Sequence, residues 1–203
     1  MSNSIVFASN NAGKIFELET LLQPFNVKIV PQATLGVNEI PETASTFVEN
    51  ALIKARHACQ ITGLPAIADD SGLQVNALHG APGIYSARFA GEKATSQDNI
   101  NKLLSELINV PPDKRQARFY CVLVYMKHAN DPTPLICEGI WEGLILQKSL
   151  GTSGFGYDPI FWDPIKNAGA AQLSIIEKNQ CSHRGYALKL LIDKLQNNLI
   201  CQL

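Results

Sequence analysis

Two adjacent carboxylates stand out in this sequence. Asp69 and Asp70 directly follow a short apolar run, Ala66 to Ala68. Neighbouring carboxylates repel each other and resist burial unless a cation or hydrogen bonds offset the cost. A divalent metal is the economical explanation, because Mg²⁺ takes one or two carboxylates and completes its shell with water and phosphate oxygens. The alternative is a solvated Asp-Asp-Ser-Gly turn, which Gly72 favours.

A magnesium site would need one more acidic ligand. The polar stretch ahead of the aspartates contains Glu39 and Glu42, and Asp70 with one of these glutamates would suffice. Successive side chains of a strand point to opposite faces, so only one of the two aspartates needs to face a ligand.

Two predicted helices begin with basic residues, which is unfavourable at the positive end of a helix dipole unless an anion is bound there. The first start is the loop of Ser9, Asn10, Asn11, Ala12, Gly13 and Lys14. The second is Ser182, His183 and Arg184, with Lys178 upstream. Backbone N–H groups, the Arg184 fork and the Lys178 ammonium can all bind phosphate. An ordinary strand-to-helix connection and solvated charges are the alternatives, but two basic starts favour an anionic ligand.

A glycine-rich stretch from Gly151 to Pro159 carries two aromatics and an acid. Its second half contains Phe155, Gly156, Tyr157 and Asp158. Glycines allow close backbone approach, an aromatic ring can stack on a base, and a carboxylate can accept hydrogen bonds from a ring N–H. The stretch is typical of a binding loop; the alternative is a tight hairpin loop whose aromatics cap the core.

The elements that position these residues form one continuous α/β unit, a single domain over residues 1–203, with a mixed sheet whose strand order stays open. The patterns predict strands at 4–9, 27–30, 66–68, 73–77, 117–127 and 135–146, the last two paired antiparallel, and helices at 14–24, 46–63, 97–108 and 184–195. The second helix begins with a capping box, Thr46 to Glu49, and ends at Gly63. Lys54 lies on a polar stripe of that helix.

Composition excludes several classes of protein. The 203 residues are 46% hydrophobic and 17% charged, as in folded globular chains, and the net charge of −1 gives no footprint for a nucleic acid or an anionic membrane. No signal peptide or membrane span is predicted, which indicates a cytoplasmic protein. The first basic loop is not a Walker A motif, because Ile15 stands where a Ser or Thr would hold magnesium. The cysteines lack metal or disulfide spacing and are predicted to be reduced; they are Cys59, Cys121, Cys137, Cys181 and Cys201.

Seven motifs spread over nearly the whole chain resemble the Ham1/RdgB family of inosine triphosphate pyrophosphatases. In chain order they are SNNAGK, PET with TFVENALIKA, AIADDSGL, GAPGIYSARFAG, ARFYCVLVY, GFGYDPIF and SHRGYAL. The resemblance implies a mixed, elongated sheet flanked by helices that form two lobes around a central cleft. It also implies a homodimer and Mg²⁺-dependent hydrolysis of ITP, dITP and XTP to the monophosphate and pyrophosphate.

The resemblance also implies roles for individual residues. Ser9 to Lys14 would cradle the triphosphate, with Lys54 on the phosphate side. Glu42 and Asp70 would hold magnesium, Asp70 would also be the base for the attacking water, and Asp69 would support them. Ser71 would touch the substrate, Phe155 to Asp158 would recognise the purine, and Lys178, Ser182, His183 and Arg184 would complete base and phosphate binding. Ser9 departs from the threonine common in the family, and Asn10 from its glycine.

This chemistry is coherent, because phosphoryl transfer needs positioning, charge neutralisation and an oriented water rather than a covalent nucleophile. Donors aimed at the purine O6 would reject an adenine amino group. Two other functions remain as alternatives: a pyrophosphatase for modified pyrimidine or bulky nucleotides, as in Maf-type proteins, and a nucleotide-sensing module without turnover. The clustered acids Asp69, Asp70 and Glu42 argue against a pure binder.

Overall fold

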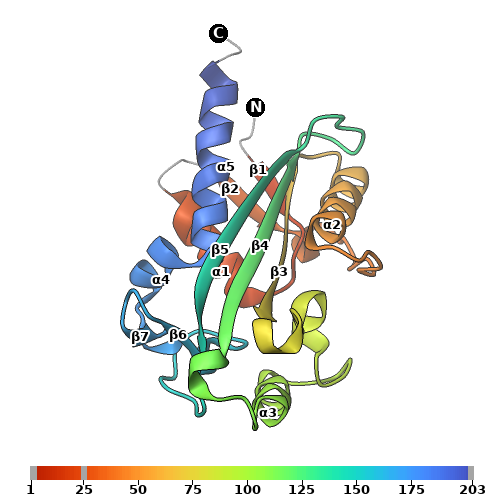
Figure 1. The fold of residues 1–203 in the computed structure, drawn as a ribbon. Helices are drawn as coiled ribbons and strands as arrows, with labels where there is room; N and C mark the ends of the chain where they lie inside the picture. Colours follow the sequence, from red (N-terminus) through yellow and green to blue (C-terminus); the bar gives the residue numbers. More distant parts are fainter. Residues whose placement is uncertain (1–3, 24–26, 201–203) are drawn as a thin grey trace. The chain divides into compact units, whose positions relative to one another are not determined.

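The computed structural model describes residues 4–23 and 27–200, with side chains as far as residue 196 (Figure 1). The helices are α1 (Ala12–Leu22), α2 (Phe47–Thr62), α3 (Ser96–Glu106), α4 (Ile175–Cys181) and α5 (His183–Ile200). The strands are β1 (Ser4–Phe7), β2 (Lys28–Pro31), β3 (Ala66–Val75), β4 (Gln116–Met126), β5 (Leu135–Ile145), β6 (Phe161–Asp163) and β7 (Ala168–Gly169). Short 3₁₀ turns connect several of them.

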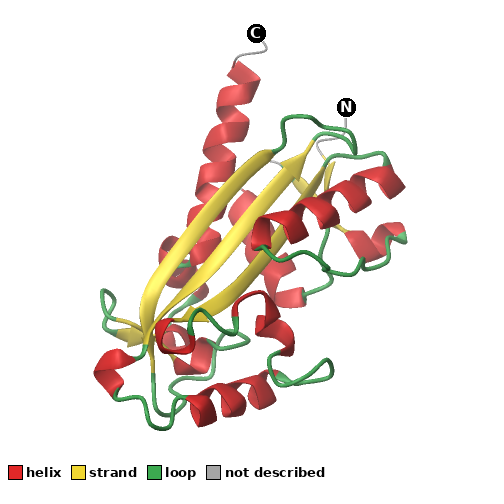
Figure 2. Cartoon of the chain, turned by 45° about the vertical axis from the view of Figure 1, so that its right-hand side comes forward, coloured by secondary structure: helices red, strands yellow, loops and turns green. Residues whose placement is uncertain are grey.

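The strands form one mixed sheet in the order β2-β1-β3-β4-β5-β6-β7, flanked by helices (Figure 2). β1 pairs in parallel with β2 and with β3, where Phe7 lies opposite Ile67. β6 pairs antiparallel with β5 and β7. The predicted α/β class with a mixed sheet is confirmed, and the long strands β4 and β5 are neighbours as expected.

The chain divides into two compact units, each with its own core. Unit 1 comprises Met1–Asp70, Cys121–Gly139 and Arg184–Leu203, and unit 2 comprises Ser71–Tyr120 and Ile140–His183. The unit 1 core includes Phe7, Leu18, Ile67, Cys121 and Leu188. The unit 2 core includes Leu73, Leu103, Phe119, Trp141 and Phe161. The single domain and the cleft between lobes stay predictions.

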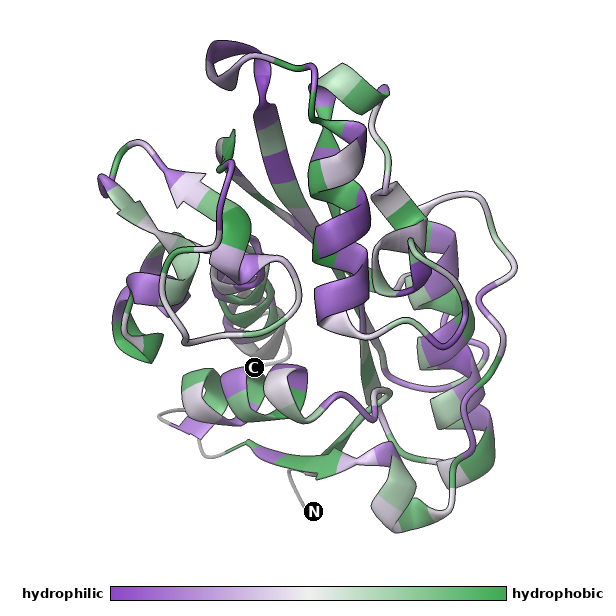
Figure 3. Cartoon of the chain, turned by 90° about the horizontal axis from the view of Figure 1, so that it is seen from below, coloured by the Kyte–Doolittle hydropathy of each residue, from purple (hydrophilic) through white to green (hydrophobic). Residues whose placement is uncertain are grey.

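Within unit 1, α1 and α5 lie on one face of the strands and α2 on the other (Figures 1 and 2). α1 and α5 supply Leu18 and Leu188 to the unit 1 core, while α2 buries Ala51 and Ala55. Helices that cover a sheet on one side expose a polar face on the other. Figure 3 shows this amphipathic character, since the helices carry both hydrophilic and hydrophobic residues.

Local capping explains where the best-predicted helix begins and ends. The Thr46 hydroxyl accepts a hydrogen bond from Glu49 N at 3.3 Å, and Gly63 ends α2 in the left-handed conformation with φ 67°. The first helix begins at Ala12 rather than Lys14, because the Asn11 side chain caps it. α4 was not predicted; Ser174 and Glu177 cap it with a reciprocal pair.

Two expectations of the sequence need correction. The Asp-Asp-Ser-Gly turn is wrong, since β3 continues without interruption from Ala66 to Val75. Ser182 was expected to be only the N-terminal cap of the last helix. It is also the C-terminal cap of α4, and α5 begins directly after it at His183. Cys59, Cys121, Cys137 and Cys181 are free and buried, and Cys201 lies outside the described residues. Among the described helices, none has both the length and the apolar character needed to cross a bilayer.

Candidate active site

The Ser9–Lys14 loop leaves the carboxyl end of β1, which has β2 on one side and β3 on the other. In open α/β sheets this reversal of strand order is where ligands bind. Asn11 Oδ1 accepts from Lys14 N at 3.1 Å, and Asn11 N donates to Ser9 Oγ at 3.2 Å. These bonds order the loop, while Asn11 and Ala12 stay exposed in the first turn of α1, where helical N–H groups lack intrahelical partners. The loop therefore presents N–H donors to solvent.

Asn10 fastens this loop to the segment that follows β2. Its Nδ2 donates to Glu39 Oε1 at 2.9 Å, and its Oδ1 accepts from Gln32 Nε2 at 3.3 Å. Glu39 is thus engaged with Asn10, whereas Glu42 lies against Lys54. This division favours Glu42 over Glu39 as the glutamate that accompanies Asp70.

Asp69 is buried among positive charges on the α1 and α5 side of β3. Its carboxylate accepts from Lys14 Nζ, from Arg184 Nε at 3.0 Å and from Cys121 Sγ at 3.2 Å. Burial alone would raise the pKa of Asp69, but Arg184 and Lys14 outweigh it and hold that pKa well below the ordinary value. Asp69 is therefore an ionised carboxylate at neutral pH, and it holds two cations in place.

Arg184 is itself buried between two acids. Its guanidinium also donates to Glu17 in α1. Burial lowers the pKa of Arg184, yet the carboxylates of Asp69 and Glu17 raise it above its ordinary value. The predicted contact of Arg184 with phosphate stays a prediction, because the bonds seen here go to carboxylates.

Asp70 points to the opposite face of β3 and meets the α2 lysine. Lys54 Nζ donates to Glu42 Oε1 at 2.6 Å and to Asp70 Oδ1 at 3.0 Å. Burial raises the pKa of Asp70, and Glu42 raises it further against the opposing effect of Lys54. The pKa of Lys54 is raised, because the two carboxylates outweigh its burial. Two carboxylates thus converge on one positive charge.

The donor set of this cluster fits a small divalent cation. Asp70 Oδ2 is buried and has no hydrogen-bond partner among the described residues, although buried carboxylate oxygens are normally satisfied. Within the same part of the chain, no group of three or more His, Cys, Asp or Glu side chains has metal-binding geometry. A cation that needs only two protein carboxylates, and takes water and phosphate oxygens for the rest, matches Glu42 and Asp70.

A second group of predicted residues gathers inside unit 2. Asp158 Oδ2 accepts from Phe155 N at 2.8 Å and from Lys178 Nζ at 2.7 Å. The Lys178 ammonium lies 4.8 Å from the centre of the Phe155 ring. Gly154, at φ 81°, leaves no room for a side chain, since an added Cβ would lie 2.1 Å from Asp158 Oδ2. The glycine-rich stretch is thus built around a buried ion pair.

The other predicted residues of unit 2 are not part of the Asp158–Lys178 ion pair. Tyr157 belongs to the core, donates from its hydroxyl to Ser86 O at 2.9 Å, and has a pKa raised by burial. The buried His183 ring stacks on Phe119 with centroids 4.8 Å apart. Ser182 is also buried, and its N–H donates to Lys178 O at 2.7 Å. Gly156 has φ 61°, and Ser71 is half-buried in β3.

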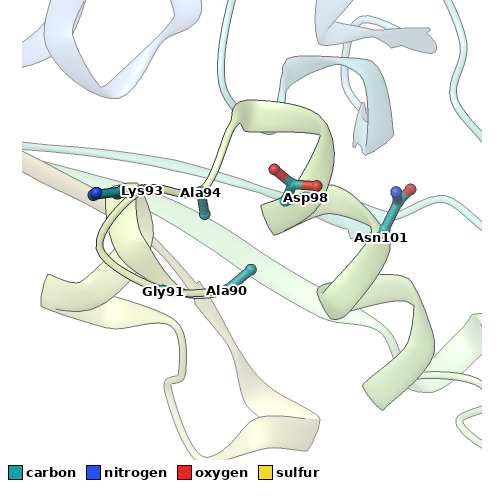
Figure 4. Close-up of a pocket in the computed structure, with 6 residues that line it drawn as sticks. All are labelled: Ala90, Gly91, Lys93, Ala94, Asp98 and Asn101. Atoms are coloured by element: carbon teal, nitrogen blue, oxygen red, sulfur yellow. The ribbon is translucent and has the colours of Figure 1, made fainter.

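Unit 2 also contains a hollow of about 560 Å³ near the start of α3 (Figure 4). It is lined by Ala90, Gly91, Lys93, Ala94, Asp98 and Asn101. The Lys93 side chain points away from the Asp98 carboxylate, which accepts from Thr95 N at 2.8 Å as part of a helix cap. No residue predicted for the site lines this hollow.

Sequence reasoning missed Glu17 and Cys121 as partners of the acid–base cluster. Glu17 had a detectable signal: it lies three residues after Lys14 and beside Leu18 on the buried face of α1. A glutamate at such a position requires a basic partner. Cys121 carries no comparable signal, because a buried cysteine in a strand reads as a small hydrophobe.

Comparison with known proteins identifies relatives over nearly the whole chain. The family model described as "Ham1 family" matches residues 5–194. A Shigella flexneri protein named dITP/XTP pyrophosphatase is 60% identical over 193 residues, covering 95% of this chain and 98% of that protein. A Vibrio cholerae protein of the same name is 56% identical over 197 residues, covering 97% and 98%. The solved structure of a HAM1 protein from Coxiella burnetii has a TM-score of 0.89 at 50% identity, covering 96% of this chain and 98% of that one.

Proposed function

Because the chain belongs to the Ham1 family, we propose that it hydrolyses dITP, ITP and XTP to the monophosphate and pyrophosphate. The names of its near full-length relatives support this substrate class. The observation that carries the proposal is the state of Asp70, which has one oxygen on Lys54 and the other buried without a hydrogen-bond partner in the described chain. A carboxylate in this state is prepared for a cation and a water.

The phosphate groups are assigned to unit 1. The first-turn N–H groups after Asn11 provide donors for the triphosphate, and Lys14 adds a positive charge that Asp69 already holds in place. Lys54 serves the same phosphates from α2. Arg184 supports this arrangement by fixing Asp69, so that Lys14 is presented in a defined position.

Glu42 and Asp70 would hold Mg²⁺, which supplies charge neutralisation on the phosphate oxygens. Asp70 rather than Asp69 is the general base. The pKa of Asp70 is raised by burial, whereas two cations hold the pKa of Asp69 low and make it a poor proton acceptor. The opposite surroundings of the two aspartates therefore separate their roles.

Recognition of the purine is assigned to unit 2, through Phe155, Asp158, Lys178, Ser182 and His183. The Phe155 ring offers a stacking surface, and the buried Asp158–Lys178 pair offers an acceptor and a donor in fixed positions. A ligand that leaves such buried groups unsatisfied is penalised, which supports discrimination between an oxo and an amino group at purine C6. Tyr157 contributes by anchoring the loop through Ser86. Gly156 belongs to the same loop, and Ser71 would touch the substrate from β3.

The substrate class is tested by measuring pyrophosphate release from dITP, ITP, XTP, dGTP, ATP and dTTP, with and without Mg²⁺. We expect turnover of the three deaminated purine nucleotides to exceed that of ATP by about 10²-fold or more. The reason is that a hydrogen-bonding site strongly penalises a substrate with a mismatched group. Turnover of dTTP in preference to dITP would instead identify a pyrimidine-directed enzyme. Release of inorganic phosphate rather than pyrophosphate would contradict the proposed bond cleavage.

A variant that removes the N-terminal cap of α1 tests the role of the phosphate loop. Asn11→Ala should lower the free energy of unfolding by about 1 kcal/mol, since it removes the cap of α1. It should also raise KM for dITP, because the same side chain orders the loop. Thr95→Ala is the matched control, since Thr95 caps α3 with the same kind of bond. Denaturant unfolding should show a similar loss of unfolding free energy for both variants. If both variants have the same KM for dITP, the Ser9–Lys14 loop does not take part in substrate binding.

We further propose that the enzyme acts as a homodimer on the cytoplasmic nucleotide pool. The free, buried thiols of Cys59, Cys121, Cys137 and Cys181 support a reducing compartment. The dimer rests on the family resemblance.

A further inference from the structure

Asn50 is a fully buried polar residue that the proposed mechanism leaves without a task. It lies in the first turns of α2 with 0% of its surface exposed. Lys54, which binds Glu42 and Asp70, follows it by four residues on the same side of the helix. Burying an amide costs free energy unless its hydrogen bonds are made. Its position next to the acidic cluster therefore calls for an explanation.

The orientation of the Asn50 amide is determined by its partner. The Ala44 N–H can only donate, and it lies 3.0 Å from the side-chain oxygen of Asn50. The amide nitrogen consequently points the other way, and it has no hydrogen-bond partner among the described residues. Asn50 therefore acts through its oxygen on the irregular segment that precedes α2.

That segment carries Glu42, and α2 holds it at two points. Lys54 Nζ binds the Glu42 carboxylate at 2.6 Å, and Asn50 Oδ1 binds the Ala44 backbone two residues later. Glu42 lies outside regular structure and is half-buried, so no helical or strand bonds fix its backbone. The Lys54 bond holds the Glu42 carboxylate, whereas the Asn50 bond holds the backbone next to it. The Ala44 bond is thus the constraint that fixes the path of the segment on which Glu42 lies.

We propose that Asn50 is a positioning residue that fixes Glu42, through the Ala44 N–H, in the place where Glu42 and Asp70 together bind the divalent cation. This role rests on the proposed function, which makes these two carboxylates the metal ligands. Residues that orient the ligands of a metal are nearly as important as the ligands themselves, and their loss weakens metal affinity by about 10- to 100-fold.

Direct binding of Mn²⁺ to the nucleotide-free protein, measured by isothermal titration calorimetry, tests this role independently of activity. Asn50→Ala should weaken Mn²⁺ binding by about tenfold or more. Asn50→Asp keeps an oxygen at the position that Ala44 N–H requires, so it should restore most of the affinity. Gln60→Ala, at an exposed position of the same helix, should bind Mn²⁺ as the wild type does.

A variant of Ala44, the donor of the hydrogen bond to Asn50, provides an independent test. Ala44→Pro removes the N–H donor and leaves Asn50 in place. If one hydrogen bond carries the effect, Ala44→Pro and Asn50→Ala weaken Mn²⁺ binding alike, and the double variant is no weaker than either single variant. Circular dichroism confirms that each variant is folded.

Unchanged Mn²⁺ affinity in folded Asn50→Ala would overturn the proposal, as would additive losses in the double variant. Equal losses in Asn50→Ala and Asn50→Asp would also overturn it, because the oxygen would then be irrelevant. If Asn50→Ala does not fold, Ala44→Pro and Asn50→Asp decide the question. Failure of the wild-type protein to hydrolyse dITP would instead reject the proposed function, whatever the Mn²⁺ titrations show.

Discussion

Asp70→Asn is expected to lower the rate of pyrophosphate release from dITP by about 10³-fold or more, since it removes the general base and one carboxylate of the metal site. The substitution is isosteric and keeps an oxygen that can accept from Lys54. Because burial and Glu42 raise the pKa of Asp70, its ionised form is less favourable in the folded protein than in the unfolded chain. Thermal unfolding should therefore show an unchanged or higher midpoint.

Asp113→Asn serves as the control, because Asp113 is exposed in a 3₁₀ turn. It should retain wild-type rate and stability. An Asp70→Asn variant that keeps a tenth or more of the wild-type rate would show that another group activates the water. A folded variant with a lowered unfolding midpoint would show that ionised Asp70 stabilises the protein, contrary to the direction of its pKa.

The second large effect is expected in stability. Arg184→Met should lower the free energy of unfolding by about 3–5 kcal/mol, because it leaves the buried carboxylates of Asp69 and Glu17 without their shared guanidinium. Chemical denaturation at pH 7 measures this loss. Arg56→Met is the matched control, since Arg56 is exposed and binds only the Ala129 carbonyl at 3.1 Å in the described chain. It should cost about 1 kcal/mol or less.

The stability loss in Arg184→Met should depend on pH in a direction that follows from the pKa of Asp69. The folded-state pKa of Asp69 is lowered from 3.8, so its ion pairs contribute stability above that pH and lose it as the pH falls further. The difference in unfolding free energy between the wild type and Arg184→Met should therefore become smaller below about pH 4. Adding Glu17→Gln to Arg184→Met should recover part of the loss, since one stranded charge disappears. A constant difference at all pH values would exclude Asp69 as the partner that matters.

Local signals in the sequence were sufficient for α2, which carries Lys54. Thr46, Glu49 and Gly63 specify the ends of α2 through bonds between neighbouring residues. Asn11 caps α1 through an equally local bond, although the helix was predicted to begin at Lys14 rather than at Ala12. These interactions span only a few residues, so they can be recognised without a structure. The helix position of Lys54 followed from them.

The strand through Asp69 and Asp70 could not be predicted in the same way. Local propensity favours a turn at Asp-Asp-Ser-Gly, and the extended conformation survives because distant cations meet the carboxylates: Lys14, Lys54 and Arg184. These partners are up to 115 residues away in sequence. No spacing rule connects them. The order of the strands was hidden for the same reason.

Asp69 draws its partners from helices that are far apart in the sequence, Lys14 from α1 and Arg184 from α5. During synthesis the ribosome delivers Lys14 and Asp69 early, whereas Arg184 emerges only with the last helix. Until then a carboxylate destined for burial lacks its guanidinium, and the strand that also carries Asp70 is short of the charge that stabilises it. Completion of the ion-pair network therefore waits until Arg184 has been synthesised, so a truncated chain that stops before Arg184 cannot assemble it.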